Sequence, residues 1–281
     1  MVKINKLIKI FIIPLLIALM AISSYFLIKI IIKDNKQNET LKSIENIAIF
    51  SEGNAASNLK IETEAENIDE INCNNKSIAV TQESKKSQNF KENTFNLQKL
   101  RNINPDIVGW IKIEGTNINY PIMQNENYYL YKDFYKNDSS YGTPFLASSC
   151  NINTSENLII YGHHAKNGSM FANLNKYKNK NFYKNHRIIK LYTFEDKNTV
   201  LNTYEIAYIF KTVAYSDNGF KYYNFYNLQS IEDFDSFILN CRKIQLYDTD
   251  VVPKYGDKFI TLSTCEYSQK NGRMVIVARK I

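Results

Sequence analysis

The run FITLSTC (Phe259–Cys265), followed by RMVIVARKI (Arg273–Ile281), is the part of the sequence that decides the fold. Both runs are rich in Val, Ile and Thr, which favour strands, and the residues between them are polar, which favours a turn. The two runs therefore predict a β-hairpin. A loop centred near Gln269 places Cys265 opposite Arg273, whereas a tight Asn271-Gly272 turn places Cys265 opposite Ala278. The sequence leaves both registers open.

Further short runs with the same strand-like composition precede this hairpin. They are VGWIKI (Val108–Ile113), INYPI (Ile118–Ile122), TPFLA (Thr143–Ala147), LIIYGHH (Leu158–His164), IIKLYTF (Ile188–Phe194) and VLNTYEIAYIFKTVAY (Val200–Tyr215). Helices are expected at Phe95–Asn102, which the Asn104-Pro105 signal ends, at Ser169–Asn179 and at Ser230–Lys243. Many short strands with few helices predict a mainly β fold, a closed or nearly closed barrel with helical decorations.

The N-terminus predicts a membrane anchor. From Ile10 to Ile28 the chain has no charged residue, and a helix of that length spans roughly 28 Å, close to one bilayer core. The basic excess is slightly larger on the N-terminal side, which favours a cytoplasmic N-terminus and an extracellular remainder. No small-residue cleavage site closes the run, so we prefer an uncleaved, single-pass signal anchor to a cleaved signal peptide.

Composition divides the chain into three regions. Residues 1–33 hold the cytoplasmic N-terminus and the anchor, residues 34–92 form a polar stalk, and residues 93–281 form the globular domain. The stalk is rich in Asn, Glu, Lys and Ser and has no aromatic residue between Phe50 and Phe90. Weak amphipathic helices are expected at Asn38–Phe50 and Ile61–Ile71. We expect the stalk, partly helical and partly disordered, to hold the domain away from the membrane.

Composition also limits which partners and which kinds of site are expected. The chain has 35 Lys+Arg and 28 Asp+Glu, a net charge of +7, but the lysines are spread along it and no nucleic-acid motif occurs. We therefore expect no nucleic-acid partner. With only three histidines and no carboxylate cluster, we expect no metal site. Of the four cysteines, Cys241 is expected in the core, Cys73 lies in the stalk, and disulfide pairing stays open.

Cys265 is the strongest candidate for a reactive group. It ends a predicted strand and polar residues follow it at once. A reactive thiol needs a nearby cation, which Arg273 supplies in one of the two hairpin registers. His163 and His164 end another predicted strand. Since successive side chains alternate between the faces of a strand, only one of these rings is expected to share a site with Cys265.

Four segments, in order, carry a resemblance to the sortase family, and within it to class B. They are NPDIVGWIKIEGTNINYPIMQ (Asn104–Gln124), IIYGHHAKNGSMF (Ile159–Phe171), TLSTCEYS (Thr261–Ser268) and RMVIVAR (Arg273–Arg279). The resemblance implies a barrel of about eight strands with N-terminal helices and an inserted helix, here Ser230–Lys243. It also implies that His163, Cys265 and Arg273 are catalytic.

The resemblance further implies four substrate-binding residues: Leu130, Ser216, Tyr222 and Ser263. The implied activity is that of a membrane-anchored cysteine transpeptidase that needs no cofactor. Cys265 would attack after a Thr in the C-terminal sorting signal of an exported protein, forming a thioester. A peptidoglycan amine, or an amine of a pilin-like protein, would then resolve the thioester.

Two alternatives remain open. One is a membrane-anchored cysteine peptidase that hydrolyses wall or surface peptides. The other is a non-catalytic surface-binding module. Mixing the protein with sorting peptides and an amine separates them, because a ligated product, a hydrolysed product or no product is expected in the three cases.

Overall fold

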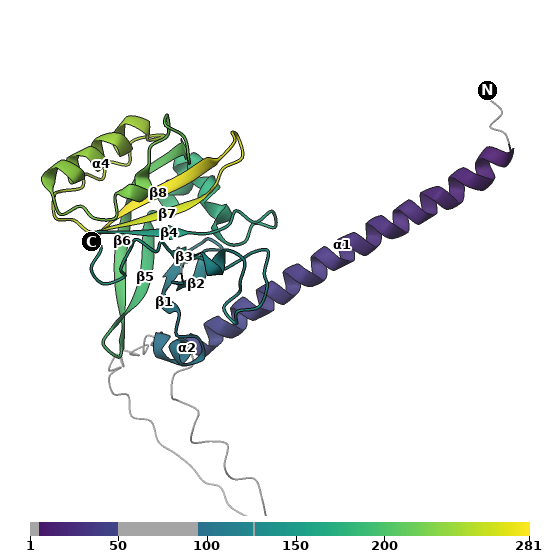
Figure 1. The fold of residues 1–281 in the computed structure, drawn as a ribbon, viewed down its shortest axis with the longest axis horizontal. Helices are drawn as coiled ribbons and strands as arrows, with labels where there is room; N and C mark the ends of the chain where they lie inside the picture. The colour runs from purple at the N-terminus through teal and green to yellow at the C-terminus, as the bar shows by residue number, and fades with distance from the viewer. Residues whose placement is uncertain (1–5, 50–94, 126) are drawn as a thin grey trace, which may run out of the picture.

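A closed barrel with the strand order β1-β2-β3-β4-β7-β8-β6-β5 forms the body of the protein (Figure 1). The computed structural model describes residues 6–49, 95–125 and 127–281. Within them the strands are β1 (Ile107–Lys112), β2 (Asn119–Met123), β3 (Phe145–Leu146), β4 (Asn157–Tyr161), β5 (Ile188–Glu195), β6 (Asn198–Val213), β7 (Phe259–Cys265) and β8 (Gly272–Lys280). Each predicted run contains a strand, although β4 ends at Tyr161, before the Gly-His-His that the prediction included. The predicted mainly β barrel is confirmed.

The β7–β8 hairpin adopts the wider of the two predicted registers. Cys265 lies opposite Arg273, because the turn closes through a hydrogen bond from the Glu266 amide to the Gly272 carbonyl (2.9 Å). A Cβ atom on residue 272 would lie 2.3 Å from the carbonyl oxygen of Glu266, so the turn requires glycine at this position. The tight Asn271-Gly272 turn, which would place Cys265 opposite Ala278, does not form.

Parallel pairing of β4 with β7 brings two distant segments together. Their register runs from Asn157 beside Phe259 to Tyr161 beside Ser263. The C-terminal ends of both strands therefore lie at the same end of the barrel. The side chains between them, including Ile159 and Leu262, are fully buried in the main apolar core, whose burial is the chief source of stability.

The inserted helix α4 (Ile231–Ile244) is confirmed where the sequence predicts it. Ser230 caps it by accepting a hydrogen bond from the Asp233 amide (3.0 Å). The apolar face buries Phe234, Phe237 and Cys241 against the barrel, as the helical spacing predicts. Cys241 is thus a core residue.

The predicted helix at Ser169–Asn179 has a different form. Residues Phe171–Lys178 are a 3-10 helix, η3, and a separate helix, α3, covers Lys180–Asn185. Asn179 separates them, because its backbone is extended (φ −97°, ψ 117°) and its side chain caps the Asn181 amide (2.8 Å). Short 3-10 turns also occur at Tyr128–Leu130 (η2) and Tyr222–Asn224 (η4).

Helix α2 (Leu97–Ile103) is confirmed with its expected end. The Asn96 side chain accepts from the Gln98 amide at the start, and the Asn104 amide bonds to the Leu100 carbonyl at the end. Leu97 and Leu100 are buried beside Trp110, in a second apolar cluster on the outside of the barrel.

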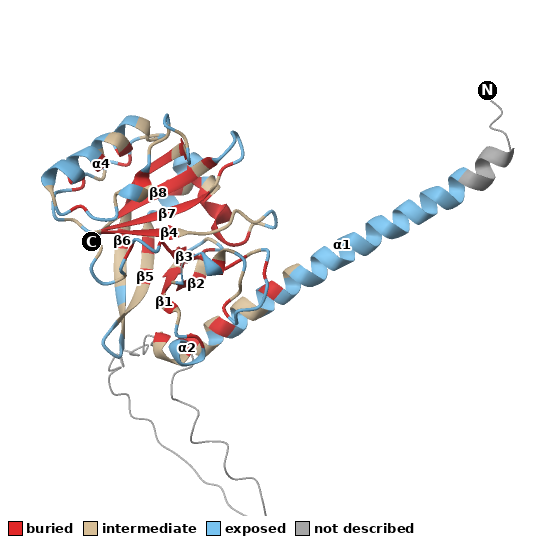
Figure 2. Cartoon of the chain, viewed as in Figure 1, coloured by how far each residue is buried: buried red, intermediate tan, exposed pale blue. Residues whose placement is uncertain are grey.

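The N-terminal helix α1 (Lys6–Ile49) is a single continuous element of 44 residues. An 18-residue window within Ile12–Ile49 has a mean hydropathy of 2.4 and none of it is buried, so the helix is long and apolar enough to cross a membrane. Figure 2 shows this exposed half projecting from the domain, with buried residues only toward its other end.

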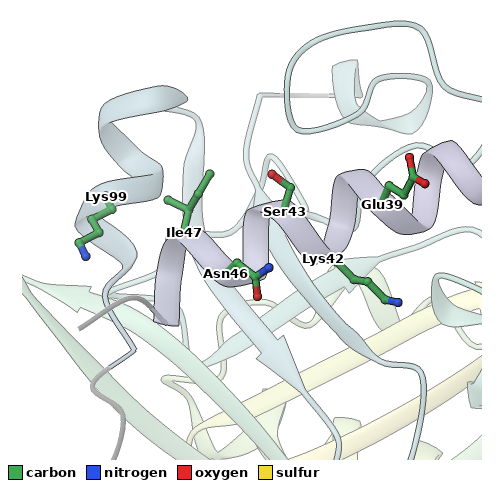
Figure 3. Close-up of a pocket in the computed structure, with 6 residues that line it drawn as sticks. All are labelled: Glu39, Lys42, Ser43, Asn46, Ile47 and Lys99. Atoms are coloured by element: carbon green, nitrogen blue, oxygen red, sulfur yellow. The ribbon is translucent and has the colours of Figure 1, made fainter. Parts of the chain in front are cut away.

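The C-terminal turns of α1 pack on the domain. Ile44 and Ala48 are fully buried in the cluster that contains Trp110, and the Ala48 carbonyl accepts from the Asn96 amide (2.8 Å). Side chains of α1 and α2 line a hollow where these helices meet (Figure 3): Glu39, Lys42, Ser43, Asn46, Ile47 and Lys99. The helix expected at Asn38–Phe50 is therefore the end of α1 and does not begin a separate element at residue 34. The expected Ile61–Ile71 helix and Cys73 lie outside the described residues.

Candidate active site

Three segments meet in a cleft of about 500 Å³ at one end of the barrel. Cys265 is the last residue of β7, Arg273 is near the start of β8, and His163 follows the end of β4. All three side chains line the cleft, which falls within the volume range of small-molecule and peptide-side-chain sites. The barrel thus brings together the three residues that the sequence singled out.

Cys265 and Arg273 are direct cross-strand neighbours. In an antiparallel pair, opposed side chains project from the same face and their Cβ atoms lie about 4.5–5.5 Å apart. The Arg273 Nη1 donates to the Gly272 carbonyl (3.0 Å), so one end of the guanidinium is held by the backbone of its own strand. Arg273 therefore supplies a fixed positive charge beside the thiol.

His163 reaches the cleft because the chain after β4 stays paired for one more residue. The Gly162 amide donates to the Ser263 carbonyl (3.1 Å), and the Thr264 hydroxyl donates to the Gly162 carbonyl (2.7 Å). A Cβ atom on Gly162 would lie 2.6 Å from the buried Phe171 ring, so the segment needs glycine here. Strand alternation consequently continues through residue 163.

The His163 ring is oriented by the connection between β2 and β3. Its Nε2 lies 2.7 Å from the Leu130 carbonyl oxygen, which can only accept, so this nitrogen carries the proton. In the neutral ring Nδ1 is then the unprotonated nitrogen, and in the charged ring it is a second donor. The ring therefore has one nitrogen that is fixed and one that can exchange a proton.

His164 lies behind Cys265 and does not line the cleft. Its Nδ1 is 3.0 Å from the Cys265 carbonyl oxygen and 3.1 Å from Asn175 Nδ2, and its ring stacks on Tyr267 at 5.0 Å. His163 thus lines the cleft with Cys265, whereas His164 contacts the Cys265 backbone outside the cleft, as strand alternation predicts.

Glu266 is a buried carboxylate immediately after Cys265, and only 3% of its surface is exposed. Lys178 of η3 pairs with it at 2.5 Å, and the Ser268 amide donates to it at 3.1 Å. Burial raises the pKa of this carboxyl, but the bonds from Lys178 and Ser268 outweigh burial and lower the pKa to about 2. The sequence showed Glu266 only as a polar neighbour, since its partner is 88 positions away.

Of the four substrate-binding residues that the resemblance implies, Leu130, Tyr222 and Ser263 line the cleft. The Tyr222 hydroxyl lies 2.6 Å from Ser263 Oγ, and both residues are buried. Burial raises the pKa of Tyr222 to about 12, so the phenol stays protonated at neutral pH. Ser216 is not among the lining residues; its hydroxyl accepts from the Asn218 amide (3.3 Å) in a turn.

Sequence reasoning missed a group of aromatic lining residues. They are Tyr161, Tyr215, Tyr223 and Tyr226. The 20 tyrosines of the chain are spread through many segments. Which of them line the cleft becomes clear only from the folded barrel, which brings these segments together.

The other described cysteines are poor nucleophiles. Cys150, Cys241 and Cys265 are all free thiols in the described part of the chain, so no disulfide joins them. Burial raises the pKa of Cys150 and of Cys241, which keeps both protonated and unreactive. Cys265 is the partly exposed thiol, and it lies in the cleft.

Known proteins share this architecture. The family model described as "Sortase domain" matches residues 111–281. Sortase B of Staphylococcus aureus (strain NCTC 8325 / PS 47) is 33% identical over 189 residues, covering 66% of this chain and 74% of the relative. Sortase B of Listeria monocytogenes is 35% identical over 191 residues, with the same two coverages.

Solved structures agree with the sequence relatives. The X-ray structure of Clostridium perfringens sortase B superposes with a TM-score of 0.59 at 31% identity, covering 66% of this chain and 98% of that structure. A Staphylococcus aureus sortase B–substrate complex gives 0.58 at 32% identity, covering 66% and 84%. A family match over most of the chain, and a cleft built from the residues that carry the resemblance, lead to one conclusion: the chain belongs to the sortase family of transpeptidases and is of class B.

Proposed function

We propose that this protein is a membrane-anchored cysteine transpeptidase that cuts the C-terminal sorting signal of exported proteins after a Thr. It would join the new carboxyl end to a peptidoglycan amine through a thioester intermediate. The observation that carries the proposal is the meeting of Cys265, His163 and Arg273, from three separate segments, in one cleft.

In the first half-reaction the Cys265 thiolate attacks the Thr carbonyl carbon. A C–S bond forms, and the carbonyl oxygen takes up negative charge, which the Arg273 guanidinium beside the thiol stabilises. The C–N bond then breaks, and protonated His163 gives its proton to the leaving amine. The result is a thioester on Cys265.

In the second half-reaction the acceptor amine attacks the thioester carbon. His163, now neutral, takes the proton from the attacking nitrogen, and the C–S bond breaks. The hydrogen bond from Nε2 to the Leu130 carbonyl leaves Nδ1 to exchange protons in both steps. An amide bond forms and the Cys265 thiolate is restored.

The same cleft would hold the sorting peptide. Leu130 offers an apolar wall, and the buried, hydrogen-bonded Tyr222–Ser263 pair forms another part of the lining. The related Staphylococcus aureus structure is, by its title, a substrate complex. Contact of Ser216 with the peptide stays a prediction, since Ser216 reaches the cleft only through its neighbour Tyr215.

The proposed topology places the N-terminus in the cytoplasm and residues 34–281 outside the cell. The lysines before the apolar run support this orientation. Protease added to intact, wall-stripped cells should remove the catalytic domain. Full protection of the domain in sealed protoplasts would contradict the orientation.

The decisive experiment mixes the full chain with a library of sorting peptides and an amine, and follows masses. A ligated product and an acyl-enzyme on Cys265 are expected, and Cys265→Ala should lose both. Cys150→Ala is the matched control, since it removes another free thiol that lies in the core. Hydrolysis alone would indicate a peptidase. No acyl-enzyme at all would indicate a binding module.

A further inference from the structure

Three large aromatic side chains stand exposed at the end of the barrel that holds the cleft. Tyr215, Tyr267 and Tyr131 are 81%, 71% and 61% exposed, the highest values among aromatic residues in the described part of residues 95–281. Tyr215 lines the cleft, the Tyr131 ring lies 6.0 Å from the His163 ring, and the Tyr267 ring lies 5.0 Å from the His164 ring. We call these three the rim tyrosines. Grouped exposed aromatic rings are typical of a contact surface.

One rim tyrosine, Tyr131, lies in a connection that contacts α1 where the helix leaves the domain. The Tyr141 hydroxyl donates to the Asp34 carboxylate, and the Lys33 ammonium lies 5.5 Å from the centre of the Tyr141 ring. Tyr141 belongs to the same β2–β3 connection as Tyr131. Asp34 also lines a hollow together with Asn167, in the loop that follows the two histidines. The apolar, unburied part of α1 ends only two positions earlier, at Ile32.

The direction of α1 is fixed relative to the barrel. The helix is unbroken from Lys6 to Ile49, and Ile44 and Ala48 bury its far end in the domain. In Figure 1, α1 rises from α2 toward the upper right, and the β7–β8 hairpin also reaches its tip at the upper side, far from α2. Membrane-spanning helices tilt by only about 20° on average, so the membrane plane is nearly perpendicular to such a helix. A membrane around α1 would therefore face this end of the barrel.

We propose that the rim tyrosines lie in the headgroup region of the bilayer that holds α1, so that the cleft opens toward the lipid surface. This inference rests on the membrane anchoring in the proposed function. Tyrosine suits the position, because its ring is apolar and its hydroxyl stays hydrated at a membrane–water interface. A substrate still attached to the membrane would then meet Cys265 without leaving the interface.

In the β2–β3 connection the contact depends on Tyr131 more than on attraction to anionic lipids. The lysines of the β2–β3 connection are already paired, Lys132 with Asp138 at 2.9 Å and Lys136 with Asp106 at 3.0 Å. Asp133 further offsets their charge. The contact of this connection should therefore persist at high salt, which screens exposed charges.

The test places a tryptophan at each end of one strand. Tyr267→Trp follows β7, whereas Tyr255→Trp, at a position 52% exposed, precedes it. The seven residues of β7 alone separate the two ends by about 20 Å. Trp110, the one native tryptophan, is fully buried and gives a constant background. The full chains are placed in vesicles of phosphatidylcholine and phosphatidylglycerol whose acyl chains are brominated close to the headgroup.

We expect the added emission of Tyr267→Trp, and likewise of Tyr131→Trp, to be roughly halved by brominated lipid, while that of Tyr255→Trp is unchanged. Tyr215→Trp replaces either rim variant that does not fold. Equal quenching at all positions, quenching of Tyr255→Trp alone, quenching at only one rim position, or no quenching at all would overturn the proposal. The readout needs no turnover, so a failure of the proposed transpeptidase reaction would leave it unaffected.

Discussion

The two adjacent histidines have different surroundings, and this difference can be tested. The His163 ring lines the cleft and is held by the Leu130 carbonyl, whereas His164 bonds to the Cys265 carbonyl from behind. A general acid/base contributes about 10²–10⁴-fold to rate, so His163→Ala should lose that much transpeptidation. His164→Ala, the matched control, should lose less than its neighbour by a wide margin. Rates of both purified, folded variants give the comparison, and a more severe loss in His164→Ala would reverse the assignment.

The Tyr222–Ser263 pair makes a prediction about stability. The two hydroxyls are 2.6 Å apart and both residues are buried. Tyr222→Phe leaves Ser263 Oγ without this partner, which should lower the free energy of unfolding by about 1–3 kcal/mol. Adding Ser263→Ala should recover part of that loss, because it removes the unpaired group. Urea unfolding of the two single variants and the double variant measures the coupling, and strictly additive losses would contradict it.

At the scale of elements, the ion pair between Lys178 and Glu266 joins η3 to the β7–β8 turn directly after Cys265. The pKa of Glu266 is lowered to about 2, since the bonds from Lys178 and Ser268 outweigh its burial. A carboxyl with a lowered pKa in the folded state stabilises the fold above its unfolded pKa, near 4.5. This stabilisation is lost as the pH falls from about 4.5 toward 2.

Glu266→Gln should therefore be less stable than the parent at neutral pH, and the difference should shrink as the pH falls through that window. Thermal unfolding of both chains at a series of pH values provides the measurement. Glu195→Gln is a suitable control, because Glu195 at the end of β5 is exposed and forms no ion pair within the described residues. A Glu266→Gln deficit that stays constant to low pH would show that shape, and not charge, matters at this position.

The strands were predictable from the sequence, because the local composition of a segment indicates a strand. The register of strand pairing and the ends of helices were not predictable. The Val, Ile and Thr content of FITLSTC predicts a strand whatever it pairs with. The choice between opposing Cys265 to Arg273 or to Ala278 depends on the close approach of Gly272 to the Glu266 carbonyl. The break at Asn179 similarly depends on a side-chain cap that competes with a continuous helix.

At the scale of the whole molecule, the sequence motifs predicted that Cys265, His163 and Arg273 share a site, but the surroundings of these residues were not predictable. The Leu130 carbonyl that orients His163 is 33 positions away in the chain, and the lining tyrosines come from three separate segments. No local pattern relates such residues. The sequence also does not predict that α1 continues past Lys33. The segment after Lys33 is polar, and its buried residues are too widely spaced to reveal the packed face of a helix.

The packing of α1 on the domain leads to a last prediction. Ile44 is fully buried, and truncating a buried Ile to Ala costs about 2–5 kcal/mol. If that cost falls on the attachment of the helix, local opening of the α1 end should increase at least about tenfold. Asn46→Ala is the matched control, since Asn46 is exposed on the same turn. In Ile44→Ala the backbone amides of residues 37–49 should exchange hydrogen faster than in the parent full chain, while those of β7 and β8 keep their rates. Faster exchange in β7 and β8 as well would mean that Ile44 stabilises the barrel itself, and unchanged exchange in residues 37–49 would mean that other contacts hold the helix in place.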